Sequence, residues 1–263
     1  MWRRRRRGSL NALTQDRPKG STMTNHQLRI LAATFASAAA VLGPQAAGLA
    51  QADTNPACSA VKVVFARGTF EAPGIGDTGQ AFVDSLNAKL GQPVGVYAVD
   101  YPASLDFQAA ANGVADASRE VQSIAATCPN TKIVLGGYSQ GAAVAGYTTA
   151  SAIPAGFTLP ADITGPMPAS VASHVAAVAL FGTPDPWFLN LVDHSAPPIA
   201  IGDAYVNKTI QECNQGDPVC SPGGLDRSAH SAYKNNGTAD QAAAFVVNQL
   251  SSTSVSQTAR DSA

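Results

Sequence analysis

Short apolar segments alternate along the chain with longer stretches whose apolar residues recur at helical spacing. The segment 175–181, VAAVALF, contains no polar residue, and strands that are apolar on both faces are typical of parallel sheets covered by helices on both sides. The pattern therefore predicts an α/β fold with a mainly parallel five-stranded sheet and helices on both faces. The predicted strands cover residues 61–65, 94–99, 132–135, 175–181 and 205–210.

The longer stretches between and after these strands have the periodicity of amphipathic helices. Asp77 is of the residue type that caps a helix N-terminus, so we expect a helix to begin there. The Pro- and Gly-rich segment 153–168 is predicted to be a long loop within the domain, and 251–263 a loose tail. The predicted helices cover residues 77–90, 106–126, 142–152 and 239–250.

The first 52 residues have the features of an export signal rather than of a folded domain. Residues 23–52 combine a weakly basic start, an apolar run at 30–42 and small residues at 50–52 that suit a signal-peptide cleavage site. Residues 1–22 form a basic extension upstream of a second methionine start, and both general secretion and twin-arginine export stay open. We therefore expect one folded domain at 53–250 in a secreted protein, extracellular or associated with the cell wall.

Removal of the export segment changes the charge balance. The whole chain has a formal charge of −1, with 17 Lys and Arg against 18 Asp and Glu. Residues 1–52 hold eight of the basic residues and one acidic residue, which leaves nine basic and seventeen acidic residues and a charge of −8. Such an acidic domain is a poor candidate for binding nucleic acid or anionic membranes, and we expect neither as a partner, nor any integral membrane association.

All four cysteines lie after the export segment, and an even number in an exported chain predicts two disulfides. Three pairings are open. Cys213 and Cys220 close a short loop, so their pairing is the economical choice, and Cys58 would then pair with Cys128. Zinc binding is the alternative, but the cysteines lack metal-site spacing and export favours oxidation.

The segment around Ser139 is the strongest chemical signal. An apolar β-branched run leads into G-Y-S-Q-G, and a helical pattern of small residues follows. A serine on such a strand-to-helix turn projects from the sheet edge, with a helix N-terminus behind it that stabilises negative charge. Gly137 and Gly141 remove side chains that would collide in so tight a turn. Ser139 is therefore a candidate nucleophile.

A nucleophilic serine needs a base and an acid, which follow it in the order acid and then histidine in folds of this kind. Of the later histidines, His174 immediately precedes a strand and His194 precedes the last one, whereas His230 follows the last strand. His230 is therefore the candidate base. Asp217 lies in a proline-stiffened loop between two cysteines and is the candidate acid, with Asp185 as the alternative.

The reaction also requires two hydrogen-bond donors for the oxyanion of the intermediate. The backbone N–H of Gln140, directly after the serine, supplies one by the geometry of the turn. The loop after the first strand should supply the other, and Thr69 is the candidate, through its N–H and its hydroxyl.

Four motifs together resemble the cutinase family, and most of all the secreted cutinase-like proteins of mycobacteria and related actinobacteria. The resemblance covers about residues 58–250. The cysteine-bounded loop is the most specific of the motifs, which are FARGT at 65–69, GYSQG at 137–141, CNQGDPVC at 213–220 and the histidine at 230.

The resemblance implies an α/β-hydrolase three-layer sandwich that hydrolyses carboxylic esters of short to medium acyl chains, lipid or cutin-like, without metal or cofactor. Its catalytic residues would be Ser139, Asp217 and His230, with Thr69 and Gln140 as the oxyanion hole. It also implies the disulfides Cys58–Cys128 and Cys213–Cys220. The chain departs from the family in having threonine at 69, where serine is common, and in a longer 153–168 loop.

Three rival interpretations stay open. The sequence G-x-G-x-x-G at 74–79 matches a dinucleotide fingerprint, but it does not directly follow a strand. A secreted binding protein without chemistry is the second rival, and an acetylxylan-type deacetylase is the third. The ester substrate, a lipid or a polymer surface, is not specified, although Leu105, Phe107 and Leu225 are candidates for lining an acyl groove. We expect a monomer.

Overall fold

The computed structural model describes residues 58–156 and 159–261. The predicted basic extension at 1–22 and signal peptide at 23–52 lie outside the described residues. Within the described part, no helix combines the length and the apolar character needed to cross a lipid bilayer.

Five parallel strands form one sheet in the order β2-β1-β3-β4-β5. The predicted mainly parallel five-stranded sheet is therefore confirmed. Because β3 occupies the centre, the turn that follows it lies at the middle of the carboxyl edge, where ligands bind in open α/β sheets. The strands are β1 (Val61–Ala66), β2 (Gly95–Ala98), β3 (Lys132–Tyr138), β4 (Val175–Phe181) and β5 (Thr209–Glu212).

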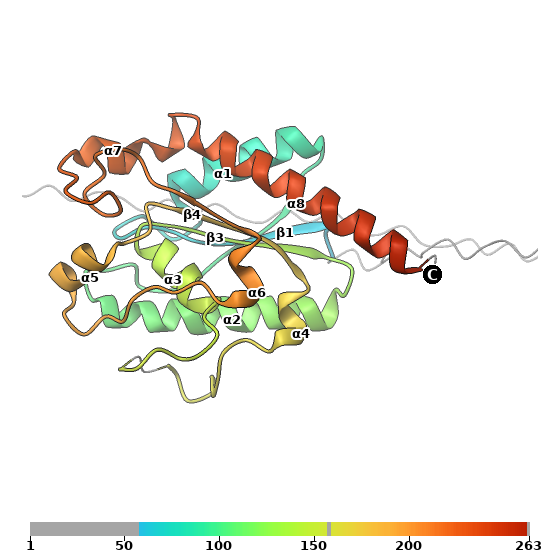
Figure 1. Ribbon diagram of the computed structural model, residues 1–263, viewed down its shortest axis with the longest axis horizontal. Helices are drawn as coiled ribbons and strands as arrows, with labels where there is room; N and C mark the ends of the chain where they lie inside the picture. The colour runs from blue at the N-terminus through green and yellow to red at the C-terminus, as the bar shows by residue number, and fades with distance from the viewer. Residues whose placement is uncertain (1–57, 157–158, 262–263) are drawn as a thin grey trace, which may run out of the picture. The chain divides into compact units, whose positions relative to one another are not determined.

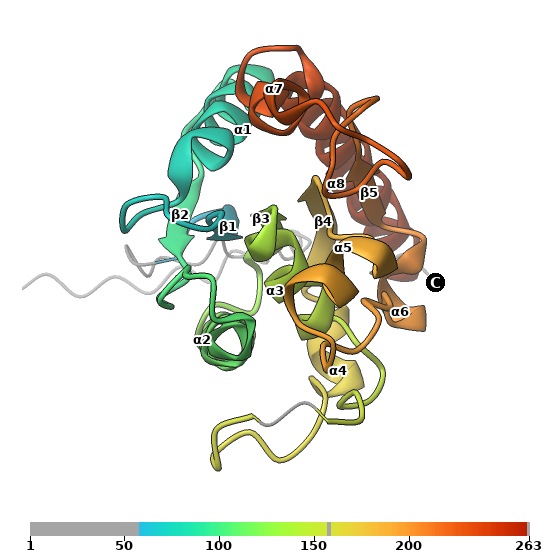
Figure 2. The same ribbon diagram turned by 90° about the vertical axis from the view of Figure 1, so that its left-hand side faces the viewer.

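Helices cover both faces of the sheet, as Figure 2 shows with the strands viewed toward their ends. The helices α1 (Gly76–Leu90) and α8 (Thr238–Asp261) pack on one face. The other face is covered by α2 (Ala110–Thr127) and α3 (Gln140–Thr148). The result is the predicted arrangement of three layers (Figure 1).

Alternate residues of each strand supply the two cores. In β1, Val63 and Phe65 pack toward α1 and α8, whereas Val64 packs toward α2 and α3. Phe65 meets Phe82 and Phe181, with ring centroids 6.2 and 6.3 Å away. Since both sets are fully buried, the strand is apolar from Val63 to Ala66, and the sequence shows no polar alternation there.

The predicted strand at 205–210 is wrong in its first half. Tyr205 and Val206 belong to a helical turn, α6 (Asp203–Val206), and β5 begins only at Thr209. Gly202, which precedes the turn, lies against the end of α3, where a Cβ would lie 2.2 Å from the Thr149 carbonyl oxygen. The turn buries the ring of Tyr205 in the core on the α2 and α3 side. Tertiary packing thus overrides the β propensity of Tyr205 and Val206.

The boundaries of three predicted helices also need correction. The segment after Leu250, predicted to be a loose tail, is helical as far as Asp261, since α8 continues through residues that include no glycine or proline. Asp77 does not cap α1 but lies in its first turn, and the Glu71 carboxylate accepts its N–H at 2.9 Å instead. The predicted helix at 142–152 begins and ends earlier, as α3.

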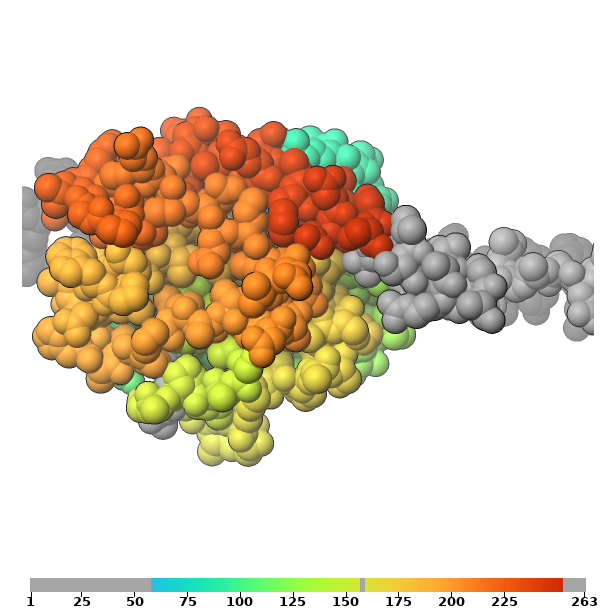
Figure 3. All heavy atoms as spheres, in the orientation of Figure 1, coloured from blue at the N-terminus to red at the C-terminus, as the bar shows by residue number. Residues whose placement is uncertain are grey.

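Several short helices lie in the connections, and none of them was predicted from the sequence except η1, which is the first turn of the predicted helix at 106–126. Among the described residues of the 153–168 loop there is neither helix nor strand, as expected. The short helices are η1 (Phe107–Ala109), α4 (Ala169–Ala172), α5 (Pro186–Val192), α7 (Arg227–Ser231) and η2 (Ala232–Lys234). Of these, α5 and α7 lie at the same end of the sheet in Figure 1, and segments from the second half of the chain cover most of the face seen in Figure 3.

Two disulfides join distant and local parts of the chain. Cys58 pairs with Cys128, which ties the start of β1 to the end of α2 with a Cα–Cα distance of 5.6 Å. Cys213 pairs with Cys220 across a separation of seven residues, just after β5. This is the pairing that the resemblance implies, and no cysteine of the described residues is free.

Candidate active site

Ser139 stands at the sharp turn between β3 and α3 in a strained backbone conformation, with φ 56° and ψ −121°. The turn is tight enough to require both flanking glycines. A Cβ on Gly137 would lie 2.0 Å from the Gly141 carbonyl oxygen, and one on Gly141 would lie 2.0 Å from that of Ala66. The glycines therefore permit the close approach of β1, β3 and α3 that lifts the serine to the sheet edge.

His230 lies beside this serine, 91 residues later in the chain. Its Nε2 is 2.9 Å from the Ser139 Oγ, and its Nδ1 is 2.8 Å from the Asp217 Oδ2. The Tyr138 hydroxyl donates to the His230 carbonyl oxygen at 2.7 Å, and the two rings lie 5.0 Å apart. Asp226 caps the short helix α7 that carries the imidazole. The structure thus places His230 between the predicted nucleophile and the predicted acid.

The other histidines lie elsewhere. His174 immediately precedes β4, at the opposite edge of the sheet, and its carbonyl oxygen accepts the N–H of Ile133. The imidazole of His194 contacts Asn190 on the exposed surface. Neither residue is brought to Ser139.

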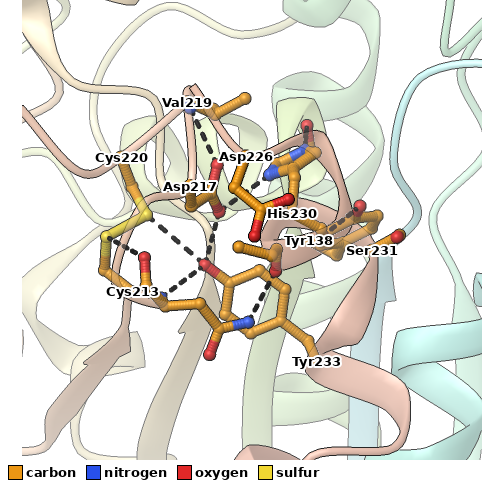
Figure 4. Close-up of polar contacts among 12 residues, drawn as sticks. Tyr138, Cys213, Asp217, Val219, Cys220, Asp226, His230, Ser231 and Tyr233 are labelled. Carbon is orange, nitrogen blue, oxygen red and sulfur yellow. Dashed lines mark hydrogen bonds and ion pairs between the residues drawn. A yellow bond between two sulfur atoms is a disulfide. The ribbon is translucent and has the colours of Figure 1, made fainter. Parts of the chain in front are cut away.

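Asp217 is fully buried inside the loop closed by the Cys213–Cys220 disulfide (Figure 4). Its Oδ1 accepts the N–H of Val219 at 2.8 Å, and its Oδ2 accepts from the Tyr233 hydroxyl at 2.6 Å and faces the His230 Nδ1. Burial alone would raise the pKa of Asp217, but these hydrogen bonds hold that pKa below its ordinary value. The carboxylate therefore stays ionised and can orient the imidazole.

The alternative acid, Asp185, has a different place. Its carboxylate accepts the N–H of Phe188 at 2.7 Å and caps the N-terminus of α5. A helix cap is a common structural role for aspartate, and the structure gives Asp185 no contact with the imidazole of His230.

The two predicted oxyanion donors lie on segments that flank Ser139. Gln140 begins α3, where backbone N–H groups have no partner within the helix. Its buried side chain donates to the Ser104 carbonyl oxygen at 2.8 Å. Thr69 is half-buried in the turn after β1, next to Gly68, where an added Cβ would lie 2.7 Å from the Tyr138 ring. The turn carrying Thr69 therefore lies against the segment that carries the serine.

Two charged residues that the sequence did not single out hold this turn. The Glu71 carboxylate accepts the N–H of Gly68 at 2.6 Å, and the buried Arg67 guanidinium donates to the backbone oxygens of Glu71, Val99 and Tyr101. In the sequence, only Arg67 has a position that could have drawn attention, directly after the first strand. Arg67 and Glu71 fix the backbone on both sides of Thr69.

The glycine-rich segment at 74–79 does not have the geometry of a dinucleotide site. A pyrophosphate in such a site sits at the helix N-terminus, but here the Glu71 carboxylate takes that position and accepts the N–H of Asp77. The side chain of Asp77 in turn pairs with Lys234 at 2.6 Å. Two carboxylates at the start of α1 would repel a phosphate.

Several segments that build the site are adjoined in sequence by exposed apolar residues. Phe70 comes after Thr69, Leu105 after Ser104, and Leu225 shortly before α7. Phe107, which the sequence suggested as a groove residue, is buried in the core and cannot line a groove. The exposed set comprises Phe70, Leu105, Trp187, Leu191 and Leu225, each more than half accessible.

Comparisons with known proteins find similar sequences along most of the chain. A family model, Cutinase, matches residues 57–250. Carboxylesterase Culp1 of Mycobacterium tuberculosis is 45% identical over 225 residues, which cover 85% of this chain and 95% of that protein. Phospholipase Culp4 of the same organism is 44% identical over 222 residues, which cover 84% of this chain and 90% of that protein.

Solved structures are similar as well. Trichoderma reesei cutinase in complex with a C11Y4 phosphonate inhibitor is 35% identical, with a TM-score of 0.53 over 73% of this chain and 77% of that one. The catalytic core domain of acetyl xylan esterase from Trichoderma reesei has a TM-score of 0.58 at 24% identity, over 73% of this chain and 99% of that one, a likeness of fold.

Proposed function

Because the chain belongs to the cutinase family and is a carboxylic ester hydrolase, we propose that Ser139, His230 and Asp217 perform the hydrolysis. Ser139 is the nucleophile, His230 the general base and acid, and Asp217 the carboxylate that orients the imidazole. The observation that carries the proposal is the continuous contact from Ser139 Oγ to His230 at 2.9 Å and on to Asp217 at 2.8 Å.

In this mechanism the Ser139 Oγ attacks the ester carbonyl carbon while His230 Nε2 takes the hydroxyl proton. The carbonyl oxygen becomes an anion that accepts from the N–H groups of Gln140 and Thr69. The imidazolium then gives its proton to the departing alcohol, leaving an acyl ester on Ser139. Water attacks that ester with the same proton transfers in reverse and releases the acid.

A fluorophosphonate probe tests the proposal directly. We expect one covalent adduct per folded, oxidised chain, located on Ser139 by peptide mass spectrometry, because only an activated serine displaces fluoride from phosphorus readily. Heat-denatured protein serves as the control and should not react. Absence of an adduct on folded protein would support the alternative, a secreted binding protein without chemistry.

Export is the second part of the proposal. The signal-like segment at 23–52, the two disulfides and the acidic charge of the domain support a secreted protein that works in an oxidising environment. An extracellular or wall-associated enzyme would meet its esters at lipid or polymer surfaces.

The exposed apolar residues support esters with apolar acyl chains over acetylated polysaccharide. We expect nitrophenyl octanoate and butanoate to be better substrates than nitrophenyl acetate, because a longer chain buries more apolar surface against residues such as Leu225. Leu225→Ser should lower kcat/KM for octanoate by roughly fivefold and leave acetate unchanged.

The matched control for that variant is Val206→Ser, which replaces another exposed apolar residue, on α6. Phospholipid and acetylated xylan complete the substrate series. A preference for acetylated xylan, with no gain along the acyl series, would support the deacetylase alternative.

A further inference from the structure

Tyr233 is a completely buried tyrosine whose hydroxyl lies inside the candidate active site (Figure 4). The hydroxyl donates to the Asp217 Oδ2 at 2.6 Å and accepts the N–H of Asn214 at 3.0 Å. It also lies 3.3 Å from the Cys220 sulfur. One phenol group therefore contacts the acid, the start of its loop and the disulfide that closes the loop.

The Asp217 Oδ2 is shared between two donors that come from one segment of chain. His230 in α7 and Tyr233 in η2 are three residues apart, and both reach this oxygen, at 2.8 and 2.6 Å. The other oxygen, Oδ1, accepts from Val219 in the same loop. With both oxygens engaged, rotation of the carboxylate would break at least one hydrogen bond to a buried group, which is costly.

We propose that Tyr233 is a positioning residue for ester hydrolysis, acting on His230 through Asp217. The inference rests on the proposed roles of Ser139, His230 and Asp217. The hydroxyl fixes the Oδ2 toward the imidazole and draws part of its negative charge to itself. The carboxylate consequently attracts the proton of the imidazolium less strongly than an undivided charge would.

The ring of Tyr233 also has a packing role, which the test must separate from that of the hydroxyl. Its centroid lies 6.1 Å from that of Phe181 and 5.9 Å from that of Tyr138. The titratable side chains that it contacts are Asp217, His230 and Tyr138. Tyr233→Phe keeps the ring and removes only the hydroxyl.

We expect Tyr233→Phe to move the acidic limb of the kcat/KM profile to higher pH by roughly half a unit. The sign follows because Asp217 then carries an undivided charge and stabilises the imidazolium form, which cannot act as the base, more strongly. We also expect kcat on the plateau to fall about fivefold, with KM unchanged. A purely structural role would lower the melting temperature without moving the limb.

Tyr205→Phe is the matched control. Tyr205 is also buried, but its hydroxyl has no hydrogen-bond partner among the residues that the structure describes, and it lies on α6. Its removal should leave the profile unchanged. If Tyr233→Phe does not fold, 3-fluorotyrosine at position 233 provides a second test, because a more acidic phenol is a stronger donor and should move the limb to lower pH.

Superimposable profiles for wild-type protein and Tyr233→Phe, or for wild-type protein and the fluorinated form, would overturn the inference. Such a result leaves the proposed function intact as long as Ser139 still takes the fluorophosphonate. If the fluorophosphonate does not label Ser139 in wild-type protein, the proposed function itself fails. The two failures are therefore distinguishable.

Discussion

Ser139→Ala is expected to lower kcat for nitrophenyl butanoate by about 10⁶-fold and to abolish fluorophosphonate labelling. Loss of a serine nucleophile has effects of about this size because base, acid and nucleophile act as one unit. The fold should persist, since alanine has the same cost as serine at the positive φ of this turn and both flanking glycines stay in place. Initial rates and a thermal melt measure the two effects.

Ser173→Ala is the control for this variant. Ser173 is exposed and its Oγ donates to the Ser170 carbonyl oxygen at the end of α4, before β4. The Ser173→Ala variant should hydrolyse nitrophenyl butanoate at wild-type rates. Turnover by Ser139→Ala above about 1% of the wild-type value would contradict the assignment of the nucleophile.

Asp217→Asn is expected to lower kcat by about 10⁴-fold. The amide of asparagine cannot satisfy all three of its neighbours. If its oxygen faces His230 and Tyr233, its NH₂ group meets the N–H of Val219, and two donors oppose each other. If the amide flips, its NH₂ group donates to the His230 Nδ1, and the imidazole proton then lies on Nε2. The protonated Nε2 faces the Ser139 hydroxyl and cannot accept its proton.

The matched control is Asp185→Asn, which changes the other aspartate that the sequence offered as the acid. Asparagine caps helices about as well as aspartate, so α5 should stay intact and kcat should remain within about twofold. If Asp185→Asn were the more damaging change, the acid would have to be reassigned. The rates of both variants are compared at one pH on the activity plateau.

The parts of the site that the sequence predicts are those in which the local pattern carries the geometry. Ser139 lies between an apolar strand and a helix, and the glycines around it indicate a tight turn whatever the rest of the chain does. Asp217 and His230 follow the last strand, so the topology brings them to the same sheet edge as the serine. In these cases chain order and sheet geometry are sufficient.

The parts that the sequence does not predict depend on contacts across the fold. Glu71 is one acidic residue in a loop, and only the structure shows its carboxylate between Gly68 and the start of α1. Phe107 has the same apolar character as Leu105, yet one is buried and the other is exposed. Tyr205 favours a strand by propensity but completes a turn, because its ring is buried against neighbouring helices.

The Cys213–Cys220 disulfide makes the rigidity of the loop around Asp217 depend on the redox potential of the surroundings. With both thiols reduced, as thiols are kept in the cytosol, hydrogen bonds such as that from Tyr233 would be left to hold the carboxylate. Ser139 and His230 are brought together through the sheet and Tyr138 rather than through this disulfide. A reducing medium should therefore loosen the loop of the acid more than the turn of the serine.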